Sequence, residues 1–153
     1  VDFAPLDDQQ VRLREFARLR LGVSQVSFER LASGPGLALL HEFLGGPAVD
    51  AATVSSCAGA GDTRARQAMQ LFARLCGAVA GNLALTCLPF GGLYLAGGVV
   101  QKNEPLFASQ TFLTAFRAKG RMADLLDDIP VRLIREPRVG LLGAAASAAS
   151  DAA

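Results

Sequence analysis

Apolar side chains recur at every third or fourth position along much of the chain, which is the spacing of amphipathic helices. The longest such pattern spans residues 64–88 and follows Asp62 or Thr63 as a helix cap. Its second half is apolar on most faces, so we expect this helix to be buried. The positions that set its spacing are Ala68, Leu71, Phe72, Leu75, Val79 and Leu83.

Shorter helical patterns lie on both sides of this one. Residues 9–21 form an amphipathic stretch that follows the capping candidates Asp7 and Asp8 and stops at Gly22. Similar signals, with proline in two of the first turns, predict helices at 28–32, 35–43, 104–117, 122–126 and 141–149, and a short helix or loop at 48–60.

Three short apolar runs predict strands. Residues 1–4 are the tail of one strand, residues 93–96 form a buried strand between two glycine pairs, and residues 129–134 form a third. The predicted order is strand, three helices, strand, helix, strand, helix. Strands separated by helices indicate an α/β fold with a mainly parallel sheet covered by helices.

Composition describes one compact domain. The chain has 153 residues, of which 51% are hydrophobic and 19% charged, and its formal net charge is +1. This balance gives no electrostatic reason to expect nucleic acid or an anionic membrane as a partner. Residues 75–101 carry no charge, but glycines, Asn82 and Pro89 interrupt them, which favours a buried helix, turn and strand over a membrane span. Because the chain starts at Val1, we expect a piece of a longer protein.

The three cysteines have neither a zinc-binding spacing nor the even number of a disulfide framework. Cys76 and Cys87 fall on nearly one face of the long helix, so we expect buried, reduced thiols. Reduced thiols fit a reducing compartment.

Two glycine-rich turns are candidates for a ligand site. Gly97 and Gly98 leave the strand at 93–96, where ligands sit in open α/β sheets and where a missing Cβ lets the backbone approach a ligand. The Ser-Gly-Pro-Gly turn at residues 33–36 precedes a helix, whose N–H groups can hold phosphate. Neither turn is a complete P-loop or dinucleotide fingerprint, so a tight turn without a ligand stays open for each.

Glu29 is the candidate ligand-binding acid. It lies two residues after Ser27, a predicted helix cap, where its carboxylate can accept hydrogen bonds from sugar hydroxyls. The alternative is a first-turn acid that complements the helix dipole. The other acids are expected to be caps or surface charges: Asp50, Asp62, Asp124, Asp127 and Asp128. His41, the only histidine, has no acid or cysteine at ligand spacing, so a metal role for it is not expected.

Taken together, several stretches resemble bacterial glucokinases of the hexokinase/actin-like sugar kinase superfamily. Residues 1–5 are similar to the segment that follows the Glu-x-Gly-Gly-His sugar-binding stretch. The resemblance covers nearly the whole chain in the expected order. Its main stretches are residues 26–37, 81–85 with 90–100, and 128–131 with 140–143.

The resemblance implies an RNase H-like (actin-like ATPase) lobe with short parallel strands and helices on both faces, and a cleft where ATP and glucose meet. Glu29 corresponds to the sugar-binding glutamate, and Gly97 and Gly98 to the adenosine motif. Ser33 and Gly34 lie near the nucleotide. The implied protein is a cytoplasmic homodimer that uses ATP and Mg²⁺ to make glucose 6-phosphate at the entry to glycolysis.

The family's Asp-x-Gly-Gly-Thr phosphate loop and its Asn-Asp pair with the catalytic aspartate are absent. We therefore expect residues 1–150 to be part of a C-terminal lobe, an incomplete domain, with residues 151–153 as a tail. It has no catalytic residue and no metal ligand, and the isolated chain should not turn over. Two alternatives stay open: the sugar-binding domain of a kinase-related transcriptional repressor, and a structural or dimerisation domain.

Overall fold

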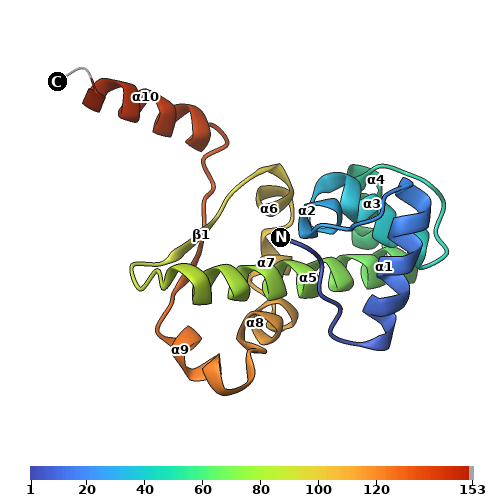
Figure 1. Ribbon diagram of the computed structural model, residues 1–153. Coiled ribbons are helices and arrows are strands. Elements are labelled where there is room, and N and C mark those ends of the chain that lie inside the picture. The colour runs from blue at the N-terminus through green and yellow to red at the C-terminus, as the bar shows by residue number, and fades with distance from the viewer. Residues whose placement is uncertain (152–153) are drawn as a thin grey trace.

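The computed structural model describes residues 1–151, which form a mostly helical fold with one small sheet (Figure 1). The helices are α1 (Asp8–Leu21), α2 (Phe28–Leu31), α3 (Gly34–Phe43), α4 (Ala51–Gly59), α5 (Thr63–Cys87), α6 (Gly98–Lys102), α7 (Glu104–Phe107), α8 (Gln110–Arg117), the short 3₁₀ helix η1 (Gly120–Met122), α9 (Ala123–Asp127) and α10 (Val139–Asp151). The strands are β1 (Leu93–Leu95) and β2 (Val131–Leu133).

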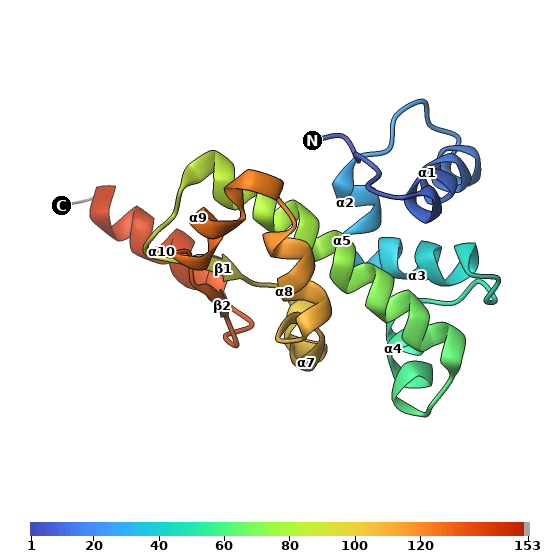
Figure 2. The ribbon, with the colours of Figure 1, turned by 90° about the horizontal axis from the view of Figure 1, so that it is seen from below.

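Helix α5 is the central element, and it runs across the whole molecule (Figure 1). Asp62 caps its start by accepting a hydrogen bond from the Ala65 N–H at 2.6 Å. It ends at Leu88, whose φ of 46° leaves the helical region, and Pro89 follows. Helices α3 and α4 pack on one half of α5, and α7, α8 and α9 on the other (Figure 2). The helix is apolar and long enough to cross a membrane, but here that apolar surface forms the core.

The most extensive helix–helix contact joins α5 and α8. Two glycines four residues apart on α5 make it possible. A Cβ on Gly77 would overlap the Phe112 carbonyl oxygen, and one on Gly81 would overlap the Phe116 carbonyl oxygen. The two phenylalanine rings stack on each other and are buried. Lys119, just beyond α8, donates a hydrogen bond from Nζ to the Ala78 carbonyl at 2.9 Å.

The N-terminal segment packs as an extended stretch rather than as a strand of a sheet. The Phe3 N–H donates to the Val26 carbonyl at 2.8 Å, and one antiparallel bridge joins Asp2 to Ser27. The strand expected at residues 1–4 is therefore wrong for the described chain, because its single partner is another irregular segment. The Phe3 ring still contributes to the core by meeting Phe28 edge-on at 5.3 Å.

Strands β1 and β2 pair in parallel, as the helix between them predicts. One face of this sheet packs on the core. On the other face Tyr94 is 56% exposed and Arg132 lies over its ring. The helices on both faces that the family resemblance implies are thus not seen within residues 1–151. The register places Leu93 opposite Val131, Tyr94 opposite Arg132, and Leu95 opposite Leu133.

Several sequence-based boundaries need correction. The helix expected at 104–117 is two helices, because Ser109 caps α8 by accepting from the Phe112 N–H at 3.3 Å. Helix α6 was not predicted. Leu83 and Cys87 lie on exposed turns near the end of α5, so the burial expected there is only partial. Helix α10 is longer than predicted and includes Asp151, while residues 152–153 of the expected tail lie outside the described part.

The glycine contact between α5 and α8 predicts an unusual substitution effect. Alanine normally stabilises a helix relative to glycine, but Gly77→Ala forces a Cβ into the α8 backbone. We expect it to lower the free energy of unfolding by about 1–3 kcal/mol, measured by urea denaturation. Gly143→Ala in the exposed helix α10, where a Cβ meets no atom within 4 Å, is the matched control and should not lower the midpoint. A Gly77→Ala protein as stable as the parent would contradict this packing.

The cysteines should differ sharply in reactivity. Burial raises the pKa of the Cys76 thiol to about 12, so at pH 8 about one thiol in ten thousand is ionised. Cys87 is exposed. We expect iodoacetamide to label Cys87 and leave Cys76 unmodified in the folded chain, and to label both in urea, as read by mass spectrometry. Equal labelling of both thiols in the folded chain would show that Cys76 is not shielded.

Candidate functional site

The Ser-Gly-Pro-Gly turn at residues 33–36 joins α2 to α3 and is built as a tight helix start. The Ser33 hydroxyl oxygen accepts from the Gly36 N–H at 3.2 Å, which caps α3. Pro35 occupies the first turn, where its missing N–H costs nothing. Gly36 is buried, and a Cβ there would overlap the Leu31 carbonyl oxygen. The four residues thus fix how closely α3 follows α2.

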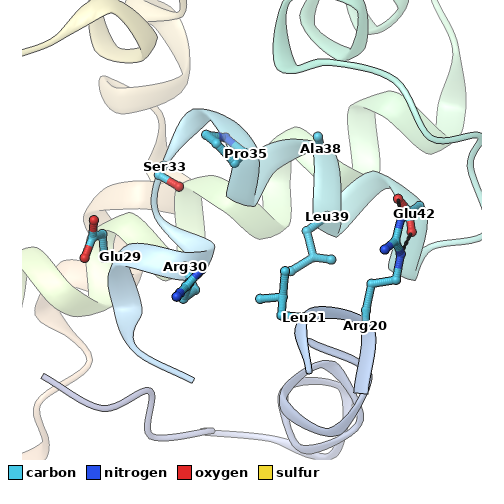
Figure 3. Close-up of a pocket in the computed structure, with 9 residues that line it drawn as sticks. All are labelled: Arg20, Leu21, Glu29, Arg30, Ser33, Pro35, Ala38, Leu39 and Glu42. Carbon is cyan, nitrogen blue, oxygen red and sulfur yellow. Dashed lines mark hydrogen bonds and ion pairs between the residues drawn. The ribbon is translucent and has the colours of Figure 1, made fainter. Parts of the chain in front are cut away.

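A cavity of about 540 Å³ opens beside this turn, between α1, α2 and α3. Glu29 and Ser33 line one part of it, and Figure 3 shows Glu29 at one end of the lining side chains. At the other end the Arg20 guanidinium donates two hydrogen bonds to the Glu42 carboxylate, at 2.7 and 3.2 Å. Because Glu42 is already paired, Glu29 is the acid of this cavity that is available to a ligand.

A second cavity, of about 600 Å³, lies between α3, α4 and α6. It brings together two turns that the sequence selected separately, since both Gly34 and Gly98 line it. A Cβ on Gly34 would lie 3.9 Å from a methyl carbon of Val99, next to Gly98. The remaining lining residues are Pro35, Leu37, Ala38, Asp50, Ala51, Ala52, Ser55, Val99, Lys102 and Asn103.

Helix α3 separates the two cavities. Pro35 and Ala38, in its first turns, line both of them. Glu29 and Ser33 therefore line the cavity on one side of α3, and Gly34 and Gly98 line the cavity on the other side.

Gly97 borders neither of these cavities. It lines a third hollow, of about 340 Å³, between α5 and β1, together with Gly98. With φ at +112°, Gly97 holds a backbone conformation that side-chain-bearing residues rarely adopt, and α6 begins immediately after it. The rest of this hollow is almost entirely apolar and includes Cys76, Leu83 and Leu95.

Metal-binding geometry is missing from the part of the chain that the structure describes: no three His, Cys, Asp or Glu side chains are grouped to hold an ion. His41 is buried and its Nδ1 lies 3.2 Å from the Pro47 carbonyl oxygen, which gives the ring a structural partner.

Sequence reasoning missed two charged residues of the second cavity, Asp50 and Lys102. Asp50 was expected to be a cap or a surface charge. It does cap α4, accepting from the Thr53 N–H at 2.8 Å, and hydrogen bonds from Thr53 hold the pKa of its carboxyl below the usual value. Its place in a cavity depends on how α4 packs beside α3 and α6, which no local pattern encodes. Lys102 was missed because it belongs to α6, a helix that the sequence pattern does not predict.

Known proteins resemble this chain over nearly its whole length. The family model described as Glucokinase matches residues 1–151. A glucokinase of Synechocystis sp. is 39% identical over 98% of this chain and 50% of its own length. A glucokinase of Yersinia pestis is 41% identical over 95% of this chain and 47% of its own length. The chain spans about half the length of the curated relatives it matches.

Solved structures agree with the family match. The crystal structure of a glucokinase from an Antarctic psychrotroph superposes with a TM-score of 0.85 and 30% identity, over 96% of this chain and 47% of that one. A glucokinase from Balamuthia mandrillaris, solved in complex with glucose, has a TM-score of 0.71 and 21% identity over 86% of this chain and 39% of that one, which supports the fold alone. On the family match and these relatives, the chain belongs to the glucokinase family.

Proposed function

We propose that the chain is part of an ATP-dependent glucokinase that phosphorylates glucose to glucose 6-phosphate, and that it supplies the adenosine side of the cleft and one sugar contact. The observation that carries this proposal is the pair of cavities on either side of α3. One holds Glu29, and the other joins Gly34 to Gly98. A kinase must bring the terminal phosphate of the nucleotide into contact with a sugar hydroxyl, and Pro35 at the start of α3 lines both cavities, so ligands held in them would lie close together.

Glu29 is the proposed sugar ligand. A carboxylate accepts hydrogen bonds from neighbouring hydroxyl groups, which is how a protein fixes the orientation of a sugar. Ser33 lies in the same cavity, and its hydroxyl proton is free of the capping bond in which the oxygen is the acceptor. The relatives named glucokinase at 39% and 41% identity support glucose as the sugar.

The nucleotide would lie on the other side of α3. Gly98, with Gly97 before it, presents backbone without side chains at the start of α6, so a ligand can approach closely. Apolar residues of α3, α4 and α6 provide walls of the kind that accept a purine. Ser33 and Gly34 position the turn at the border of the two sites.

We further propose that β1 and β2 belong to a larger RNase H-like sheet. β2 is the one strand paired with β1 among the described residues, and the apolar hollow between β1 and α5 is partly open. The curated relatives are about twice as long as the matched region. In this proposal their unmatched half supplies the additional strands that complete the sheet and cover the hollow.

Phosphoryl transfer also needs a base for the attacking hydroxyl and stabilisation of the transferred group. Residues lining the Glu29 cavity include no aspartate, and no metal-binding group occurs in the described chain. The described residues form no all-protein metal cage, so Mg²⁺ would be held mainly by the nucleotide phosphates, and the proposed roles of the described residues are binding and orientation. We place the catalytic aspartate in the half of the relatives that this chain does not match.

A cytoplasmic homodimer is part of the same proposal. The three cysteines are free thiols, as in proteins of reducing compartments. Helix α10 exposes Leu141 and Leu142 among small residues, a surface suited to contact with another polypeptide.

The sugar assignment predicts that Glu29→Gln weakens glucose binding to this chain. Glutamine has nearly the same size but lacks the charge, so we expect affinity to fall about tenfold or more. Glucose titrations followed by NMR chemical shifts would measure this. Glu15→Gln is the control, because Glu15 lies on the exposed side of α1 and pairs with Arg18. Unchanged glucose affinity in Glu29→Gln would refute the assignment.

The division of roles predicts that this chain alone does not phosphorylate glucose. We expect no ATP-dependent glucose 6-phosphate above background in an assay coupled to NADP reduction, because the other carboxylate of this cavity, Glu42, is held by Arg20 at the end opposite Glu29. The Yersinia pestis relative in the same assay serves as a positive control. Sustained turnover by the isolated chain would show that a base is present in it.

A further inference from the structure

The cavity between α3, α4 and α6 has an uneven distribution of charge. Asp50 is its one negatively charged residue and Lys102 its one positively charged residue. Asp50 caps the start of α4, and Lys102 lies at the end of α6. The other lining residues are apolar, small or neutral. A nucleotide in such a cavity meets a carboxylate at a defined position, and the chemistry of a carboxylate limits which part of the nucleotide can lie there.

The position of the Asp50 carboxylate is set by its role at the start of α4. Oδ1 accepts the Thr53 N–H at 2.8 Å, which orients the side chain. Hydrogen bonds from Thr53 lower the pKa of Asp50, so the group is ionised at neutral pH. An ionised carboxylate offers about four lone-pair sites, and the helix cap uses only part of this capacity.

The fit between this carboxylate and a nucleotide is selective. Phosphate groups are disfavoured next to it, because Asp50 is exposed and carries a charge of the same sign. A ribose, in contrast, carries two adjacent hydroxyl groups that are hydrogen-bond donors, and acidic side chains hold the ribose hydroxyls of dinucleotides in other folds. With the ribose at Asp50, the adenine base would pack against the apolar side chains of α3 and α6. The phosphates would then extend away from Asp50.

We propose that Asp50 accepts hydrogen bonds from the ribose hydroxyls of the bound nucleotide and makes this cavity selective for ribonucleotides over deoxyribonucleotides. The inference rests on the proposed function, because it requires that the cavity bind the nucleotide. It adds a specificity-determining residue to Gly34 and Gly98, and gives the nucleotide a direction in the cavity.

The test compares ADP with 2′-deoxy-ADP and 3′-deoxy-ADP on the chain as it exists, by isothermal titration calorimetry. We expect at least one deoxy analogue to bind severalfold more weakly than ADP, because a hydrogen bond to a charged acceptor is lost while water replaces part of it at the exposed Asp50 carboxylate. Asp50→Ser should weaken ADP binding by a similar factor and remove the difference between ADP and that analogue.

Serine is chosen because it also caps helices, so Asp50→Ser keeps the start of α4 while the carboxylate is lost. Asp62→Ser is the matched control: Asp62 caps α5 through the Ala65 N–H and lines none of the three cavities described above. It should bind all three nucleotides as the parent does. If Asp50→Ser does not fold, Asp50→Asn takes its place, because asparagine also caps helices and removes the charge at nearly the same size.

The outcomes distinguish the role of Asp50 from the binding of a nucleotide in this cavity. If ADP binds and both deoxy analogues bind equally well, the role of Asp50 is refuted while the nucleotide cavity stands. If ADP does not bind at millimolar concentration, the nucleotide cavity and the inference fall together. Weaker deoxy binding that persists in Asp50→Ser would assign the discrimination to another residue.

Discussion

The close approach of α8 to α5 is the constraint on which the rest of the structure depends. It requires backbone against backbone at Gly77 and Gly81, and two buried phenylalanines of α8 fill the space around it. This contact fixes the half of the molecule that carries α6 and α7, while α3 and α4 pack on the other half of the same helix. Both walls of the α3–α4–α6 cavity are thus positioned through α5.

Local signals were sufficient where a single element decides the outcome. The spacing along α5, the caps at Asp7 and Asp62, and the parallel pairing of β1 with β2 were all predictable, because each depends on period, capping chemistry or connection length. Helix α6 was not, since its five residues are too few for a periodic pattern. The burial expected at the end of α5 was wrong for a different reason. An apolar sequence indicates that burial of its side chains is favourable, but it does not show whether another segment covers them.

The candidate site divides in the same way. The sequence and its family resemblance selected Glu29, Ser33, Gly34, Gly97 and Gly98, and the structure groups four of them in two cavities across α3. Asp50 could not be selected as a site residue from the sequence, because its role as the cap of α4 already accounts for an aspartate at this position. Its place beside α3 and α6 is visible only in the structure. The alternative of a sugar-responsive repressor stays untested, since the family match describes a shared fold and a named kinase family rather than the activity of this chain.

The exposure of helix α10 limits its stability as an isolated helix. Residues 141–150 are exposed along their whole length, and the helix projects from the body of the molecule (Figure 1). A helix of 13 residues that makes no extensive contact with another described element is marginal in water even when it is rich in alanine. Its helicity is therefore conditional: folding of this segment and docking onto another surface become one thermodynamic event. The strength of any contact made through α10 is reduced by the entropy of ordering it, which makes such an assembly readily reversible.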